Sequence, residues 1–376
     1  MKKVILSAAA LLCGAVMVAQ SNTSDVLSQG DGNGSTVSQT GMTNDSDVDQ
    51  IGNDNISEMT QSGTDNSSDI DQIGANGGIS NDASVEQEGL GNSSTLMQNG
   101  TFNEGDIYQE GDNNNAHAIQ GWGWGDRNVS ETVQVGNDND SQQRQAGDDN
   151  ENYVTQEGDD NDSWARQNGD FNFSGIFQVG NENDSEINQI GDNNRAENVQ
   201  LGNNNISDIA QTGDGNYGGA GQGVNYGGIS PSDDNISYID QTGDYNNALT
   251  FQVGNKNGSK VKQSGDGNES DVDQEGNKNR SKVKQRGDGN ESDVDQDGNR
   301  NRSKVVQIGD DHTSIVTQNG FAVNMSDVRQ KGLGHMSTVN QQGDTNNSWV
   351  AQTGDTHVSD VQQLGDMNTS TVTQSN

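Results

Sequence analysis

The sequence lacks most of the residues from which a large hydrophobic core or a reactive site is usually built. Among 376 residues it holds one cysteine, one proline and four histidines, and hydrophobic residues make up only 26%. Because Cys13 lies in the apolar run at the N-terminus, the chain beyond that run has no thiol, no disulfide and no cysteine metal site. No later segment is apolar enough to insert into a membrane.

Positive charge is scarce as well. The chain has 19 lysines and arginines against 57 aspartates and glutamates, a formal net charge of −38 and a mean hydropathy of −0.98. This balance argues against a nucleic-acid partner, which requires a basic surface. By composition alone, the chain is a long acidic disordered tract that cannot bury enough apolar surface to fold. That interpretation applies to irregular sequences, and this sequence is not irregular.

The N-terminus has the pattern of an export signal. Two lysines precede an apolar run over residues 4–12, and small residues then lead to Ala19 and Gln20. This order is typical of a secretory signal peptide, and the run is too short to span a bilayer. We therefore predict a signal peptide over residues 1–20 and a secreted, acidic repeat region over residues 21–376.

A glutamine returns at every eleventh position along almost the whole chain. The runs are Gln39 to Gln72, Gln87 to Gln120, Gln134 to Gln211, Gln241 to Gln318 and Gln330 to Gln374. Around each glutamine the unit reads N-x-S-x-V-x-Q-x-G-x-x, with Ile, Leu or Met sometimes replacing Val. Self-similarity at a fixed period predicts a repeat architecture, in which polar residues stack on copies of themselves.

An eleven-residue period fits either a supercoiled helix or a strand followed by a turn. The helix is disfavoured, because every unit contains Gly, Asn, Ser and Asp, which are poor helix formers. The recurring residues lie two apart, so Ser46, Val48 and Gln50 share one face of a strand. Asp47 and Asp49 then face outward, and the glycine and asparagine that follow provide the bend.

Two such units, or 22 residues, close one coil with two facing strands. The predicted fold is therefore all-β: a β-solenoid with two strands per coil, which becomes cross-β on polymerisation. About fifteen coils at about 4.8 Å each give a rod roughly 70 Å long. Between Ser259 and Val305, units with lysine alternate with units that carry aspartate. We expect one outer sheet to carry lysines there and the opposite sheet aspartates.

Stacking in register lets each Gln or Asn amide donate to the next coil, as in cross-β ladders. A buried amide without that partner costs roughly 1–3 kcal/mol, so a mostly polar interior still demands strict register. The predicted structural ladder includes Ser46, Val48, Gln50, Gly52, Asn55, Ser270, Val272, Gln274, Gly276, Asn279, Ser281, Val283, Gln285, Gly287, Asn290, Ser337, Val339, Gln341, Gly343 and Asn346.

Three departures from the period predict loop insertions, near residues 75–80, 121–125 and 217–235. Insertions in a solenoid are expected to bulge from turns without breaking the stack. The second insertion contains Trp122 and Trp124. This pair is either a ligand platform or part of a simple exposed loop.

No motif for catalysis, a cofactor or a metal is present, so we expect none of these sites and no enzyme. Of the four histidines, His117, His312, His335 and His357, the last three replace the asparagine five positions after a repeat glutamine. His312 and His357 lie far apart in coil number, and no convergence is expected. The acidic turns lack the nine-residue motif of calcium-binding solenoids, so no specific calcium site is expected. Weak, diffuse binding of cations by stacked aspartates is the one alternative that the sequence allows.

The repeated unit resembles the curlin repeat of curli, the secreted amyloid fibres of bacterial biofilms. The match runs from about Asn22 to Gln374, and units that fit it include Ser68, Ile70, Gln72, Gly74, Ser337, Val339, Gln341, Gly343 and Asn346. The resemblance implies end-to-end polymerisation with copies of itself, a nucleator subunit and curli-type secretion machinery. This chain has more repeats than familiar curlins, and little room for a separate secretion-targeting segment.

Two functions follow from these patterns. No capping repeat is visible and the sequence stops within the repeat, so open strand edges are expected to template head-to-tail filaments. The first function is a structural subunit of a curli-like extracellular fibre, serving biofilm matrix, adhesion and cell aggregation. The alternative is a monomeric β-solenoid adhesin or cation-binding surface protein. An enzyme on a β-helix, such as a polysaccharide lyase, would need acids and bases beside a groove.

Overall fold

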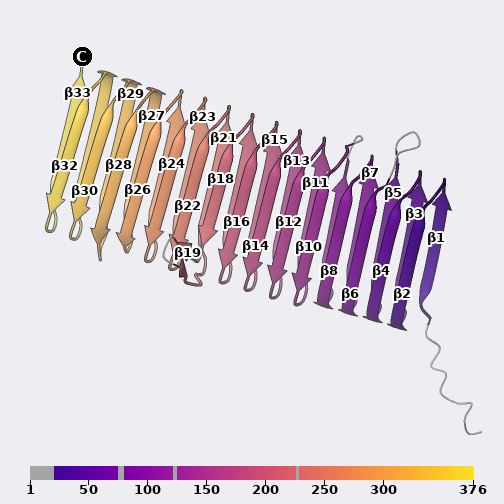
Figure 1. The fold of residues 1–376 in the computed structure, drawn as a ribbon. Coiled ribbons are helices and arrows are strands. Elements are labelled where there is room, and N and C mark those ends of the chain that lie inside the picture. The colour runs from indigo at the N-terminus through magenta and orange to yellow at the C-terminus, as the bar shows by residue number, and fades with distance from the viewer. Residues whose placement is uncertain (1–20, 75–79, 122–124, 226–227) are drawn as a thin grey trace, which may run out of the picture.

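The computed structural model describes residues 21–74, 80–121, 125–225 and 228–376, and these residues form strands joined by turns. Figure 1 shows the strands following one another along a single axis, with the first strand, β1, and the last, β33, at opposite ends of a rod. In the described ranges, no helix is long and apolar enough to cross a membrane. The predicted signal peptide lies outside the described residues.

Two long parallel sheets make up the rod. The first sheet has sixteen strands: β1 (Thr23–Gln29), β3 (Asp45–Ile51), β5 (Ser67–Ile73), β7 (Ser93–Asn99), β9 (Asn115–Gln120), β11 (Asp140–Ala146), β13 (Asp162–Asn168), β15 (Asp184–Ile190), β17 (Ile206–Thr212), β21 (Ile236–Thr242), β23 (Gly258–Ser264), β25 (Arg280–Arg286), β27 (Arg302–Asp310), β29 (Met325–Leu333), β31 (Asn347–Asp355) and β33 (Thr369–Ser375).

The second sheet has fifteen strands: β2 (Gly34–Met42), β4 (Ile56–Thr64), β6 (Asp82–Leu90), β8 (Glu104–Asp112), β10 (Val129–Val135), β12 (Glu151–Glu157), β14 (Phe173–Val179), β16 (Arg195–Leu201), β18 (Tyr217–Gln222), β22 (Asn247–Val253), β24 (Glu269–Glu275), β26 (Glu291–Gly298), β28 (Thr313–Gly320), β30 (Met336–Gln342) and β32 (Val358–Leu364). A short antiparallel pair, β19 (Val224–Asn225) and β20 (Gly228–Ile229), lies outside both sheets.

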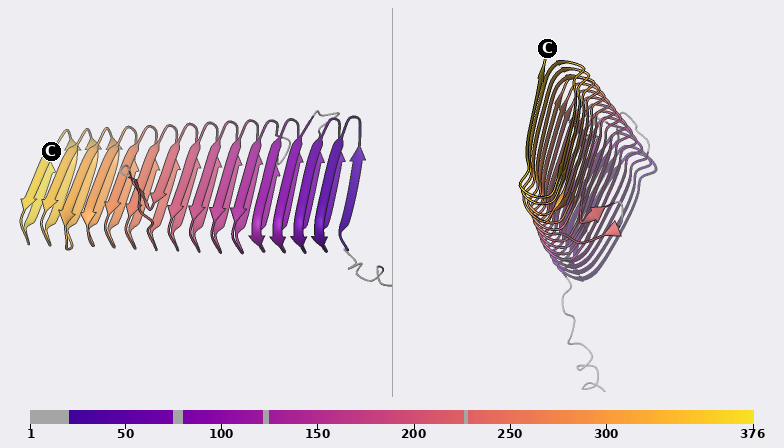
Figure 2. Two further views of the ribbon diagram at one scale, coloured as in Figure 1. Left: turned by 60° about the horizontal axis from the view of Figure 1, so that its bottom comes forward. Right: turned by 90° about the vertical axis from the view of Figure 1, so that its left-hand side faces the viewer.

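Successive strands alternate between the sheets, so each coil contains one strand of each. Gln263 pairs with Gln285, which lies 22 residues later in the same sheet, and Gln274 pairs with Gln296 in the other sheet. The view along the axis in Figure 2 shows the coils stacked around one flattened interior. The predicted β-solenoid of about fifteen 22-residue coils is confirmed.

The interior follows from the alternation of side chains along each strand. In β24, Ser270, Val272 and Gln274 are buried, whereas Asp271 and Asp273 point outward. Valines and isoleucines of successive coils form the apolar part of the core, in two clusters that cover coils before and after β10 and β11. Between the clusters, the polar Thr132 and Gln143 occupy the buried position instead.

Each turn needs a glycine for reasons of space as well as conformation. Gly276 has φ +104°, and a Cβ there would lie 2.0 Å from the carbonyl oxygen of Gly298 in the next coil. Two residues later, Lys278 adopts the left-handed region with φ +63°. An L-residue with a side chain rarely adopts the first of these conformations, whereas Asn and Asp tolerate the second. The predicted bend therefore has a steric basis at its glycine.

The third insertion is shorter than predicted. Residues 217–222 form the regular strand β18, paired with β16 and β22, so the inserted segment begins after Gln222. Most of the first insertion, and both tryptophans of the second, lie outside the described residues. Strands on either side of the second insertion still stack, but the pairing of β9 with β11 ends at Ile119 and Arg144. Gln145 Oε1 consequently has no hydrogen-bond partner among the described residues.

Candidate functional site

The glutamines form a ladder inside each sheet, continuous in the second sheet and interrupted in the first between Gln120 and Gln145. Gln274 Oε1 accepts a hydrogen bond from Gln252 Nε2 at 2.9 Å, and Gln274 Nε2 donates to Gln296 Oε1 at 2.7 Å. The Nε2 group also donates to the backbone oxygen of Gly258, at 3.3 Å, in the opposite sheet. Each glutamine thus joins three coils and both sheets, and every bond along the ladder points the same way.

Asparagines form a second ladder at the turns. The backbone N–H of Asn279 donates to Asn257 Oδ1 at 2.9 Å, in the preceding coil. Asn279 Nδ2 donates forward to the carbonyl oxygen of Gly298, at 2.8 Å, in the following coil. The side chain therefore fixes the rise between coils where the backbone leaves the sheet. Asn55 and Asn346 make the equivalent N–H bonds to Asn33 and Asn324.

The serines of the predicted ladder behave differently from the amides. Ser46, Ser270 and Ser281 are buried, yet their hydroxyl oxygens have no hydrogen-bond partner among the described residues. Ser337 accepts a bond from Ser359 at 3.2 Å. Polar stabilisation of the interior thus comes mainly from Gln and Asn, and the small serine side chain serves the close approach of the two sheets.

Contrary to the expectation from the sequence, three histidines do converge. His312, His335 and His357 occupy the asparagine position in consecutive coils, with ring centroids 5.0 and 5.2 Å apart and nearly parallel planes. Spacings of 23 and 22 residues put them on one edge of the solenoid, a relation that the 22-residue coil length could have revealed.

The stacked rings reproduce the asparagine ladder. The N–H of His335 donates to His312 Nδ1 at 3.1 Å, and His357 repeats this contact with His335 Nδ1. His312 Nε2 lies 3.2 Å from the carbonyl oxygen of Ile308, so the neutral form with its proton on Nε2 satisfies both contacts. Burial, opposed by that contact and assisted by the neighbouring His335, lowers the pKa of His312. Both ring nitrogens of His312 and of His335 are engaged, which leaves neither ring a free nitrogen to bind a metal ion.

The outer faces carry opposite charges in one segment, as predicted. Lys260, Lys282 and Lys304 stack on the first sheet, and Asp271 stacks on Asp293 on the second. In the neighbouring row, burial and the nearby carboxylates, led by Asp295, raise the pKa of Asp273 to about 6. Aspartates also stack near the N-terminus, where burial and then the carboxylates of Asp69 and Asp49 raise the pKa of Asp71 to about 6.

The coils at the two ends of the described rod expose what other coils bury. Val26 of β1 pairs with Val48 of β3, but its side chain is 45% exposed whereas that of Val48 is 0% exposed. Leu27, on the outer face of the same strand, is 43% exposed.

Within the described residues, no group of three His, Cys, Asp or Glu side chains could hold a metal ion. The coils instead present hydrogen-bond donors and acceptors, from the Gln and Asn side chains and the backbone, that match those of another coil.

Comparison with known proteins agrees with this geometry. The model of the curlin associated repeat matches residues 165–191, 260–287 and 287–320. No curated protein matches the chain. The three matches fall on regular coils, where the Gln, Asn and Gly ladders described above are continuous. The chain therefore contains curlin associated repeats.

Proposed function

We propose that this protein is a secreted structural subunit of a curli-like extracellular fibre, which grows by end-to-end addition of further copies and serves biofilm matrix, adhesion and cell aggregation. One observation carries the proposal: nearly every coil presents the same Gln, Asn and backbone groups to the next coil. A coil of a second copy meets the same requirements as the next coil of the same chain.

The direction of the ladders supports a head-to-tail contact. Every hydrogen bond from one ladder glutamine to the next is donated toward the C-terminal end of the rod, so a contact between like ends would oppose donor to donor or acceptor to acceptor. A contact between unlike ends continues the ladders. Contacts of this heterologous kind do not close, and they produce filaments. The family also implies a nucleator subunit and curli-type secretion machinery as partners, and we propose both.

The test begins with the chain from Ser21 onward, diluted from denaturant and followed by thioflavin-T fluorescence and electron microscopy. We expect a lag, then straight filaments with a fibre reflection near about 4.8 Å. A β-rich monomer that never elongates would instead support the adhesin alternative.

A matched pair of variants separates the axial contact from general effects on folding. Val26 of the first described coil stacks on the buried Val48 but is itself 45% exposed in the free protein, and Val26→Lys places a charge at this position. Elongation would bury that charge without a partner, at a cost of several kcal/mol. Leu27→Lys changes a side chain of similar exposure, 43%, on the outer face of the same strand. We expect Val26→Lys to block elongation and Leu27→Lys to leave it unchanged; equal effects would contradict the proposal.

A further inference from the structure

Positive charge is concentrated in one short segment of this acidic chain. Of the 19 lysines and arginines, 13 lie between Lys256 and Lys331, where there are also 13 aspartates and glutamates. This segment is therefore neutral overall, and the net charge of −38 resides in the rest of the chain. Within the segment, the two signs are not mixed but are sorted onto different surfaces.

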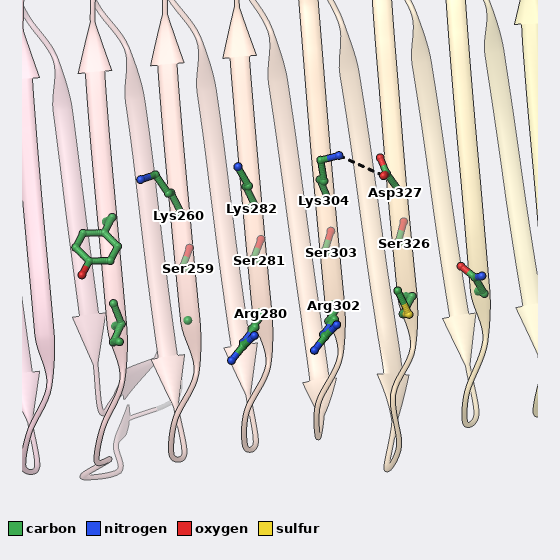
Figure 3. Close-up of a pocket in the computed structure, with 15 residues that line it drawn as sticks. Ser259, Lys260, Arg280, Ser281, Lys282, Arg302, Ser303, Lys304, Ser326 and Asp327 are labelled. Atoms are coloured by element: carbon green, nitrogen blue, oxygen red, sulfur yellow. Dashed lines mark hydrogen bonds and ion pairs between the residues drawn. The ribbon is translucent and has the colours of Figure 1, made fainter.

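The basic face lies on the outside of β23, β25 and β27. It comprises Lys260, Lys282 and Lys304 in one row, Arg280 and Arg302 in a second row, and Lys262 and Lys284 in a third. Figure 3 shows the first two rows running across adjacent strands, and a shallow groove of about 660 Å³ is lined by both. Gly258, which has no side chain, lies in the second row with open space beside it.

The acidic face lies on the outside of β24 and β26, in the same coils but on the opposite sheet. It comprises Asp271 and Asp293, Asp273 and Asp295, and Glu269 and Glu291, each pair in direct register. Both faces thus stack like charges on neighbouring strands, an arrangement that destabilises an isolated sheet.

Ion pairs satisfy the basic face only at its two ends. Lys262 pairs with Asp240 at 2.5 Å on one flank, and Lys304 pairs with Asp327 at 3.3 Å on the other. Between them, Arg280, Lys282 and Lys284 form no ion pair with any described residue. The central cations are therefore available to a partner that carries negative charge.

We propose that the basic face docks against the acidic face of a second copy of this protein, so that neighbouring rods associate side by side. The two faces belong to the same coils, so a copy displaced sideways without any axial shift brings them opposite each other. Their charges repeat at the same rise of about 4.8 Å, because both are set by the same strand spacing. An unrelated polyanion has no reason to match that spacing.

Outside the segment, the outer faces are mixed. Uncharged side chains such as Phe177 lie outward on the second sheet, and Trp164 and Trp349 on the first. Coils near the N-terminus carry carboxylates such as Asp69 and Asp71, which oppose close contact there. Many of the acidic residues instead occupy the turns at the edges of the rod. Because each copy uses different faces for its two neighbours, the association is open and leads to ribbons or bundles.

The test uses charge reversal with rescue. Lys282→Glu/Lys284→Glu reverses the charge at the centre of the basic face, and Asp293→Lys/Asp295→Lys reverses the charge at two of the six positions of the acidic face. Each variant alone should give single rods, because like charges then meet at the centre of the contact. An equal mixture of the two variants should restore pairing, since the reversed faces complement each other. Arg144→Glu/Arg166→Glu, at equivalent outward positions of β11 and β13, is the matched control and should pair like the parent protein.

Side-by-side pairing is counted by electron microscopy on preformed filaments, between about 10 mM and 1 M NaCl, where the Debye length falls from about 30 Å to about 3 Å. We expect pairing at low salt and its loss at high salt. If no filaments form, sedimentation velocity measures whether the soluble protein associates through the same two faces. Failure of the fibre proposal is therefore distinguished from failure of this one.

Two results would overturn the proposal. One is pairing that persists in both charge-reversal variants, because the contact then lies on another surface. The other is a mixture that stays single while the parent protein binds a sulfated polysaccharide through Lys282 and Lys284, because the occupant is then an anionic polymer.

Discussion

Replacing one ladder glutamine by methionine tests whether side-chain amides hold the coils together. Gln341 Nε2 donates to Gln363 Oε1 at 2.8 Å and to the carbonyl oxygen of Met325 at 2.9 Å. Its own Oε1 accepts from Gln318 Nε2 at 2.7 Å. Methionine preserves the approximate length and volume of the side chain but can make none of these bonds.

The cost follows from the partners that are left behind. Gln318 Nε2 keeps its bond to the carbonyl oxygen of Arg302, whereas Gln363 Oε1 loses the donor that reaches it from Gln341. At about 1–3 kcal/mol for each buried group without a partner, Gln341→Met should destabilise the local coils by about 2–4 kcal/mol. The adjacent Gln342 is exposed and provides the control. Gln342→Met should change local stability by less than about 0.5 kcal/mol.

Native-state hydrogen exchange on β30 and its neighbours β28 and β32 measures this difference directly. The expected loss corresponds to exchange that is roughly 30-fold to several hundredfold faster around residue 341. Because each coil contacts only adjacent coils, amides in β4 should be unaffected and serve as an internal reference. Equal protection in the two variants would refute the reasoning, since hydrophobic burial alone would then account for the stacking.

Three further predictions concern the turns and the titrating groups. Gly265 has φ +113°, and Gly265→Ala places a Cβ 2.3 Å from the carbonyl oxygen of Gly287. This substitution should lower the free energy of unfolding, measured in urea, by about 2 kcal/mol or more. Gly267 has φ +63° and no atom within 4 Å of the position that a Cβ would take, so Gly267→Asn should leave the free energy of unfolding unchanged. Asp273 has a folded-state pKa of about 6 against 3.8 unfolded, so it contributes stability below pH 3.8 that is lost as pH rises through 6. Asp273→Asn should therefore stabilise the protein at pH 7, by about 1–2 kcal/mol after solvent screening, and this gain should vanish near pH 4. For His312 the pH dependence is opposite. Its pKa is lowered from 6.5, so its contribution to stability is present above pH 6.5 and is lost as pH falls below 6.5 through the folded-state pKa. His312→Asn should therefore flatten the dependence of melting temperature on pH between about 7 and 5.

The sequence predicted those parts of the fold that depend on periodicity. Alternation around Val272 and Gln274 indicated which side chains are buried, and the alternation of lysine and aspartate units indicated the 22-residue coil. These inferences succeed because side chains of a strand alternate strictly, and because like positions stack. The sorting of Lys282 and Asp293 onto opposite sheets follows from the same two facts.

Features that depend on a change of register were harder to predict. Tyr-Gly-Gly-Ala-Gly in β18 lacks the usual serine and valine, and only Gln222, eleven residues after Gln211, shows that this strand continues the repeat. The three histidines occupy equivalent positions of the repeat, and the expectation that they do not converge was wrong because spacings of 23 and 22 residues place them in consecutive coils.

Composition misleads for this chain because it counts side chains without their partners. A buried glutamine normally costs free energy, but here the partner of Gln274 is another glutamine in the next coil, at a distance that the strand spacing imposes. The favourable bonds therefore exist only when neighbouring coils are already stacked, and no single coil can form them alone. It follows that stability must grow with the number of coils in contact, and that an uncovered coil such as that of β1 is the least stable part of the rod. Such an end gains most from a second copy, and this links the polar interior to assembly.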